Sequence, residues 1–203
     1  MVLWNPPLQE GAGTNVRRSY TDECADLLSL CLQQNLNTIV FTRARRVTEL
    51  LLRQCRELCQ DGTSAGGDAS QIATYRAGYL AEERERIETR IKSGELHGVI
   101  TTNALELGID IGNLDAAIIA GYPGTIMSTW QQAGRAGRRH REALIVLVAS
   151  QNPLDQYYMR HPQVFFAQSH ELAVIDEENP HIRLKHLLCA ARELPLSQPE
   201  LDA

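Results

Sequence analysis

Short apolar runs rich in β-branched residues alternate along this chain with longer amphipathic stretches, and this alternation constrains the fold most strongly. Several runs lack polar alternation, which is typical of strands buried on both faces of a parallel sheet. Amphipathic stretches between such strands form helices that pack on the sheet. The sequence therefore predicts an α/β fold, a parallel sheet flanked by helices on both faces. The expected strands are Val2–Asn5, Asn37–Thr42, Gln71–Arg76, Gly98–Thr102, Ala116–Gly121 and Ala143–Ala149.

The amphipathic stretches carry apolar residues at helical spacing, which predicts the covering helices. Thr21 is a suitable N-cap for the first of them, because a threonine hydroxyl accepts a hydrogen bond from the free N–H groups of a helix start. A charged helix should end before Gly94, since glycine commonly terminates helices. The expected helices are Asp22–Gln34, Ala44–Cys59, Leu80–Ser93 and Thr125–Ala136.

The pattern changes after Ser150, where aromatic residues and prolines become frequent. One more helix is expected at Asn179–Glu193, with leucines on one face. We therefore expect a first domain at residues 1–160. Residues 161–203 should form a connector and a helical C-terminal extension that begins a further, incomplete region.

The formal net charge of −5 argues against nucleic-acid binding through bulk charge. A local basic stripe on an acidic body is still compatible with such binding, and arginines crowd the segment at 135–141. No apolar run approaches the roughly 20 residues of a membrane span, and the N-terminus lacks the layout of a signal peptide. The sequence therefore predicts a cytoplasmic protein without a membrane partner.

The five cysteines show no paired CxxC spacing. Cys55 and Cys59 share a helix face at positions i and i+4, which could hold a metal ion. A pair of reduced, half-buried thiols is the commoner arrangement in a cytosolic protein. No metal site is therefore expected on this chain.

The segment at residues 131–138 reads QQAGRAGR, the most restrictive motif of the chain. A helix would place Arg135 and Arg138 on one face, and the small residues between them allow close approach of another surface. A guanidinium is permanently charged and binds phosphate oxygens with two parallel hydrogen bonds, which suits a triphosphate. A solvated basic helix end is the alternative, but the repeated Gly-Arg spacing disfavours it.

The segment at residues 100–111 reads ITTNALELGIDI. A strand that ends at Thr101 and Thr102 would direct hydroxyls and free backbone N–H groups outward, as a phosphate backbone requires. Asp110, which follows Gly108 by two residues, could accept hydrogen bonds from a ribose. Taken alone, these residues could equally form an N-cap, a turn and a structural aspartate.

Two further polar segments follow predicted strands. Thr42 and Arg43 end the second strand, and Gly78 in the segment YRAGY permits a tight turn before a helix. All four segments follow the carboxyl end of a predicted parallel strand, the edge where open α/β sheets bind ligands. We therefore expect them to form one binding surface.

In this order and spacing, the four segments resemble the carboxyl-terminal half of a superfamily 2 helicase core of the DEAD/DEAH type. They match its motif IV, YxAG element, motif V and motif VI. WNPP near the start of the chain and NPLDQYYMRHP at residues 152–162 resemble the MrfA-type DNA-repair helicases. The resemblance covers residues 1–160 and implies a RecA-like lobe, followed at 161–203 by the start of a winged-helix-type region.

The resemblance implies a role for each matching residue. Arg138 matches the arginine finger that reaches the γ-phosphate of ATP, Arg135 its companion on the nucleotide, and Gln131 a sensor between lobes. Gly108 and Asp110 match the motif V residues near the ribose. The positions that match contacts to strand phosphates are Thr42, Arg43, Gly78, Thr101 and Thr102.

Two features depart from a complete helicase pattern. Gln132 stands where the family often has arginine, so no charge is expected there. The acidic pair Asp22-Glu23 looks like a Mg²⁺-binding box, but such a box follows a buried strand, whereas the neighbouring apolar residues here have helical spacing. Both carboxylates are instead expected in the first turn of a helix, where they favour the positive end of its dipole.

The chain contains no GxxxxGK[ST] loop, so it cannot form a complete ATP site by itself. ATP and Mg²⁺ are therefore expected to bind mainly to a first RecA-like lobe, which is the expected protein partner. The expected function is the second motor lobe of an ATP-dependent DNA helicase or translocase in DNA repair, inactive alone.

Other function classes stay open at this point. A non-catalytic module that binds nucleic acid or a partner could keep the same fold, and a translocase could remodel complexes without unwinding. An RNA helicase lobe is a third alternative, because a grip on the backbone contacts phosphates and the sequence shows no reader of the 2′-hydroxyl. Single-stranded DNA as the partner therefore rests on the resemblance alone.

Overall fold

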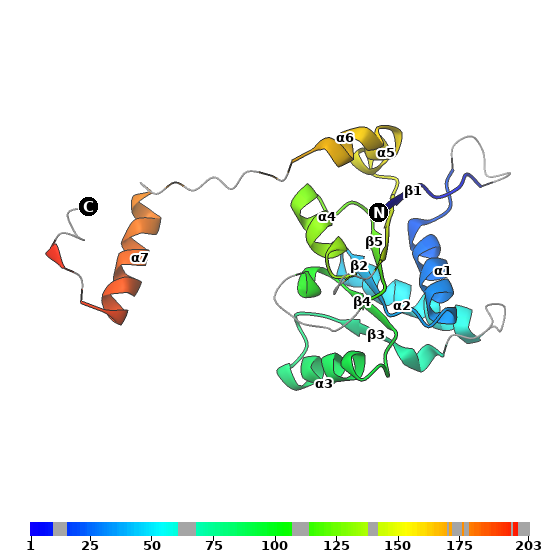
Figure 1. Cartoon of the computed structure of the whole chain (residues 1–203), viewed down its shortest axis with the longest axis horizontal. Helices are drawn as coiled ribbons and strands as arrows, with labels where there is room; N and C mark the ends of the chain where they lie inside the picture. Colours follow the sequence, from blue (N-terminus) through cyan, green and yellow to red (C-terminus); the bar gives the residue numbers. More distant parts are fainter. Residues whose placement is uncertain are drawn as a thin grey trace. The chain divides into compact units, whose positions relative to one another are not determined.

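The computed structural model describes residues 1–9, 16–60, 68–106, 114–137, 142–169, 171, 176, 179–195 and 197–198. The chain divides into two compact units, Met1–His170 and Glu171–Ala203. The first unit contains the sheet, and the second contains helix α7 (Pro180–Glu193) (Figure 1).

Six parallel strands form one sheet in the order β1-β6-β5-β2-β4-β3. All residues of three of the four inner strands, β5, β2 and β4, are buried, as the runs without polar alternation predicted. Each predicted strand is present, which confirms the α/β class. The strands are β1 (Val2–Trp4), β2 (Thr38–Thr42), β3 (Ile72–Tyr75), β4 (Gly98–Thr101), β5 (Ala116–Ala120) and β6 (Leu144–Val148).

Helices α1 (Tyr20–Gln33) and α2 (Arg45–Gln60) cover one face of the sheet. Their apolar stripes pack against every second strand residue, such as Val40 and Ile100, in one buried cluster. Alternate side chains of a strand point to opposite faces, so this face takes half of the apolar residues of each strand.

The other half of the strand residues, including Ile39 and Phe41, packs on the opposite face. Helices α3 (Ala81–Lys92) and α4 (Ile126–Ala133) lie on this face, together with the short helix η2 (Asn103–Leu105). The sheet is therefore flanked by helices on both faces, as predicted.

Two short helices follow the last strand, α5 (Pro153–Arg160) and α6 (Pro162–Ala167). Phe165 on α6 is completely buried and packs with Tyr122 and Tyr158 in a third apolar cluster. The aromatic residues after Ser150 thus serve the core of the first unit, which extends beyond residue 160.

The start of α1 differs in detail from the prediction. Ser19, not Thr21, caps the helix, because Ser19 is extended and its side chain accepts a hydrogen bond from the Thr21 N–H. The acids of the first turn are structural, as expected: buried Glu23 accepts hydrogen bonds from Trp4 Nε1 at 2.8 Å and from Arg18 at 3.1 Å.

In the second unit, α7 begins at the predicted place, where the Asn179 side chain accepts hydrogen bonds from the first free N–H groups. Its large apolar residues Ile182, Leu184 and Leu188 are exposed. None of the helices that the structure describes combines the length and the apolar character that a membrane span requires.

Candidate functional site

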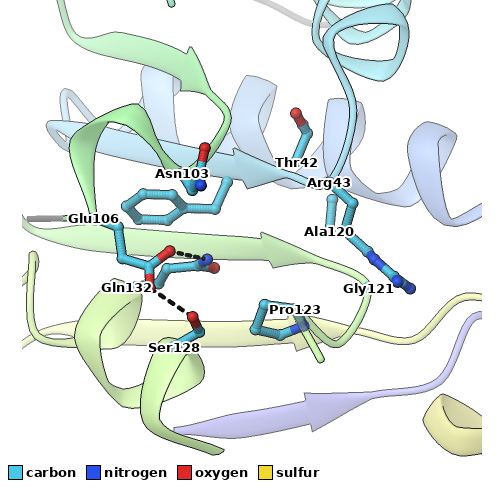
Figure 2. Close-up of a pocket in the computed structure, with 10 residues that line it drawn as sticks. Thr42, Arg43, Asn103, Glu106, Ala120, Gly121, Pro123, Ser128 and Gln132 are labelled. Carbon is cyan, nitrogen blue, oxygen red and sulfur yellow. Dashed lines mark hydrogen bonds between the residues drawn. The ribbon is translucent and has the colours of Figure 1, made fainter. Parts of the chain in front are cut away.

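The carboxyl ends of β2, β4 and β5 surround a pocket of about 320 Å³, which we call the edge pocket (Figure 2). Thr42 and Arg43 come from the end of β2, and Asn103 follows β4. Ser128 and Gln132 on α4 form the opposite wall. The edge pocket therefore lies where parallel α/β sheets usually bind ligands, and its polar lining suits a charged or strongly hydrogen-bonding one.

Two of the threonines predicted to hold strand phosphates are buried. Thr42 is 6% exposed, and its hydroxyl bonds to Thr48 Oγ1 at 2.7 Å and to the Thr101 carbonyl at 3.1 Å. Thr101 is 0% exposed, and its hydroxyl has no hydrogen-bond partner among the described residues. The Thr42 side chain thus joins the end of β2 to the backbone of β4, and both threonine side chains are buried.

Arg43 and Thr102 are more accessible and lie at the same edge. Arg43 is exposed, and Thr102 is half-buried. Thr102 is extended and precedes η2 without a capping hydrogen bond from its side chain. A guanidinium and a hydroxyl are both common donors to nucleic-acid phosphates, so the structure keeps these two predicted residues together at the surface.

Gly78 lies in a second, smaller hollow of about 190 Å³, lined by Arg45, Arg76 and Tyr79. Arg76 stacks on the Tyr79 ring at 4.8 Å and pairs with Glu49 at 3.0 Å. The structure therefore brings the start of α2 beside the turn after β3. The φ of Gly78 is not positive, so the turn does not require glycine, in contrast to the expectation from the sequence.

The segment from Gln131 to Arg135 begins at this edge, where Gln132 lines the edge pocket, and extends away from it. Helix α4 begins at the carboxyl edge, yet the Gly137 N–H beyond its end donates to the carbonyl of Leu114, which precedes β5. Eight helical residues advance about 12 Å, close to the length of a five-residue strand. Arg135, which is half-buried, therefore lies toward the amino ends of the strands, so this segment reaches the edge of the other three through Gln132 and not through Arg135.

The predicted residues Gly108, Asp110 and Arg138 lie outside the described residues. For the nucleotide part of the site, the structure thus describes Gln131 and Arg135 of the predicted set. Among all residues that it describes, no group of three or more His, Cys, Asp or Glu side chains could hold a metal ion.

The sequence analysis missed the buried carboxylate of the edge pocket. Glu106 is 8% exposed and accepts hydrogen bonds from Ser128 Oγ at 2.6 Å and from Gln132 Nε2 at 3.1 Å, as Figure 2 shows. The sequence marks Gln132 only as a departure from the family pattern. A usable signal existed, because Glu106 is a lone charge between Leu105 and Leu107, and such charges rarely face a core unless they are paired.

Buried ionisable groups are also found away from the edge pocket. Burial raises the pKa of the Cys24 and Cys55 thiols, that of Cys55 to about 12. Burial also raises the pKa of Tyr75 to about 12, with a further contribution from its hydrogen bond to Glu88. All five cysteines are free, so Cys55 and Cys59 are thiols, the former completely buried.

Comparison with known proteins identifies the family. The model of the helicase conserved C-terminal domain matches residues 21–140, which include β2 to β5 and helix α4. The chain belongs to the helicase conserved C-terminal domain family. The matched residues include the edge pocket and the segment of Arg135.

Full-length relatives extend the match to almost the whole chain. The ATP-dependent helicase YprA of Bacillus subtilis is 47% identical over 201 residues, which are 98% of this chain and 26% of YprA. The ATP-dependent helicase hrq1 of Schizosaccharomyces pombe is 41% identical over 198 residues, 97% of this chain and 18% of hrq1. This chain therefore spans about a quarter or less of the length of these two relatives.

Solved structures confirm the fold and the resemblance to superfamily 2 helicases. The DUF1998 helicase MrfA bound to DNA and AMPPNP is 46% identical, covers 95% of this chain with 26% of its own, and superposes with a TM-score of 0.82. The helicase Lhr of Mycobacterium smegmatis, bound to ssDNA and AMP-PNP, shares the fold at 23% identity and a TM-score of 0.70. This chain thus has the fold of the RecA-like C-terminal lobe of superfamily 2 helicases.

Proposed function

We propose that this chain is the second motor lobe of an ATP-dependent DNA helicase or translocase that acts in DNA repair. One observation carries the proposal: a single helix, α4, leads from the polar edge pocket at the carboxyl ends of the strands toward Arg135 near their amino ends. A motor lobe needs a site for the strand and a separate site that faces the nucleotide. The chain offers a candidate for each, and a relative of 46% identity was solved with DNA and AMPPNP.

The strand site consists of accessible donors on a fixed support. Arg43 and Thr102 contact phosphates of one strand, and Gly78 adds backbone contact near the hollow beside Arg45. Thr42 and Thr101 hold the ends of β2 and β4 in place through their buried contacts. Phosphate contacts of this type fix the register on a strand but carry no sequence information, which suits a translocase.

The nucleotide side is completed by a first RecA-like lobe, which binds most of ATP and Mg²⁺. Arg135 and Arg138 approach the phosphates, Gln131 acts between the lobes, and Gly108 and Asp110 lie near the ribose. Loss of the γ-phosphate on hydrolysis removes a contact between the two lobes and lets them open. An arginine finger contributes about 10³–10⁵-fold to the rate of such hydrolysis.

DNA is the proposed strand because the MrfA structure contains DNA, and the repair role rests on the resemblance to MrfA-type helicases. Within the predicted connector at residues 161–203, α6 belongs to the first unit, so the proposed connector to a winged-helix-type region is the second unit, residues 171–203. The exposed apolar residues of α7, among them Leu184 and Leu188, support a continuation of the fold beyond this helix.

The test replaces Arg138 by alanine in a full-length enzyme that carries this lobe. Strand-stimulated ATP hydrolysis should fall by about 10³-fold or more, because the transition state loses its guanidinium. Single-strand affinity, measured by fluorescence anisotropy, should change much less, since Arg138 faces the nucleotide.

Arg53→Ala is the matched control, because it removes a guanidinium from the exposed surface of α2. ATP hydrolysis close to wild type in Arg138→Ala would refute the arginine-finger assignment. A wild-type enzyme without strand-stimulated hydrolysis would favour a non-catalytic binding module.

A further inference from the structure

We infer that Glu106 is a positioning residue that couples strand binding at the edge pocket to the nucleotide-facing end of α4. The inference rests on the proposed function, because coupling requires a lobe that has one site for the strand and another for the nucleotide. It goes beyond that function in naming the contact that links the two.

The contact is short, buried and made by side chains from two segments. Glu106 accepts from Ser128 Oγ at 2.6 Å and from Gln132 Nε2 at 3.1 Å, one bond to each carboxylate oxygen. Glu106 and Gln132 are 8% and 5% exposed. Hydrogen bonds to a charged acceptor in a buried site are stronger than those between neutral groups, so the contact can transmit a displacement.

The position of the contact along the chain suits a coupling role. Glu106 ends the turn of η2, which begins directly after Thr102 at the strand site. Gln132 lies one helical turn before Arg135, whose N–H donates to the Gln132 carbonyl at 3.1 Å. A shift of Thr102 on binding a phosphate therefore reaches the backbone of Arg135 through two hydrogen-bonded residues.

The chemistry of the contact also speaks against a role in stability alone. A buried carboxylate is costly and is often replaceable by apolar residues without loss of stability. Gln132 Oε1 is buried and accepts no hydrogen bond from any residue that the structure describes. A buried acceptor without a hydrogen-bond donor is uncommon, and such acceptors are typical of functional sites, where some polar atoms are left without partners.

The experiment uses the full-length enzyme and compares Glu106→Ala with Glu106→Gln. The measured quantity is the ratio of ATP hydrolysis at saturating single-stranded oligonucleotide to hydrolysis without it. Glu106→Ala should lower this ratio about tenfold, while the oligonucleotide concentration for half-maximal stimulation changes less than about twofold. Glu106→Gln keeps an acceptor oxygen for Ser128 or Gln132 and should restore most of the ratio.

Glu23→Gln is the matched control, since Glu23 is also a buried carboxylate with two side-chain donors but lies on α1, outside the site. It should reduce thermal stability without changing the ratio. Gln132→Ala should reduce the ratio like Glu106→Ala, and the double variant should be no worse than either single one, as residues of one contact are not additive.

The outcomes separate the coupling role from the proposed function. An unchanged ratio in both Glu106→Ala and Gln132→Ala refutes the coupling role and leaves the motor-lobe assignment intact. A reduced ratio in Glu23→Gln as well would reduce Glu106 to a stabilising residue. Absence of stimulation in the wild-type enzyme would refute the proposed function itself. If Glu106→Ala does not fold, Gln132→Ala alone decides, because it leaves the bond between Glu106 and Ser128.

Discussion

Thr42 and Thr101 end neighbouring strands, but their hydroxyls differ in what they bond. The Thr42 hydroxyl bonds to Thr48 and to the Thr101 carbonyl, while the Thr101 hydroxyl is buried and has no partner within the described part of the chain. A threonine hydroxyl at a strand end can therefore either bond to neighbouring strands or contact a ligand, and only the surroundings of the side chain decide which. The accessible donors of the proposed strand site are Arg43 and Thr102.

This difference predicts opposite effects of the same substitution. Thr42→Val should lower the free energy of unfolding by about 1–2 kcal/mol, because it leaves Thr48 and the Thr101 carbonyl without their partner. Thr101→Val removes a hydroxyl with no described partner and should leave the free energy unchanged or raise it by up to about 1 kcal/mol. Urea denaturation of the isolated chain measures both, and equal losses would contradict the assignment.

At the scale of elements, the turn that leads from β5 to α4 fixes the wall of the edge pocket. Gly121 follows β5 with a φ of +80°, and the Asp155 carboxylate of α5 accepts from the backbone N–H of Tyr122 at 3.2 Å and of Ser150 at 2.8 Å. Buried Asp155 thereby ties α5 to the ends of β5 and β6. The motif NPLDQYY, noted in the sequence for its resemblance, has a structural role in this turn.

Gly121→Ala should therefore affect both folding and binding. A left-handed backbone costs a residue with a side chain about 1–2 kcal/mol. The new Cβ would lie at ordinary contact distance from Arg43 Cδ (3.7 Å) and from the Asp155 carboxylate (3.4 Å). A backbone shift that relieves the strained φ would therefore move the neighbours of Arg43, and the affinity of the full-length enzyme for single-stranded oligonucleotide should fall.

Gly94→Ala supplies the comparison, because Gly94 has a φ of +75° and no atom within 4 Å of an added Cβ. Its loss of stability in urea denaturation should be similar, while fluorescence anisotropy should show unchanged strand affinity. A similar drop in affinity for both variants would mean that strain alone, and not proximity to Arg43, is responsible.

At the scale of the whole molecule, the core contains acids that must stay protonated. Burial raises the pKa of Cys24 and Cys55, the latter to about 12, and that of Tyr75 to about 12. In the unfolded chain these groups lose protons from about pH 8.5 for cysteine and about pH 10 for tyrosine. Their stabilising contribution is therefore complete below about pH 8 and is lost as the pH rises toward 12.

Urea denaturation at a series of pH values should show this loss as a falling free energy of unfolding above about pH 9. Cys55→Ala should make the decline shallower, even though the variant is less stable at neutral pH. Cys189→Ala should leave the decline unchanged, because Cys189 is exposed. A free energy that stays constant up to about pH 11 would show that these groups ionise without unfolding.

The sequence by itself determined the class of fold and the family. Six apolar runs and the covering helices could be read from local patterns, since burial on two faces and helical spacing leave direct marks in the order of residues. The motifs identified the helicase resemblance, because residue types at fixed spacing survive as a linear pattern. Of the predicted strand-phosphate residues, the structure leaves Arg43 and Thr102 accessible at one edge.

Only the tertiary structure decided which of these residues face outward and which segments meet. Burial of Thr42 and Thr101, the displacement of Arg135 from the common edge and the bond between Glu106 and Gln132 all depend on packing between distant segments. A linear pattern records the type of a side chain but not its direction. The length of α4 against the sheet separates the edge pocket from Arg135, and no local preference encodes that distance.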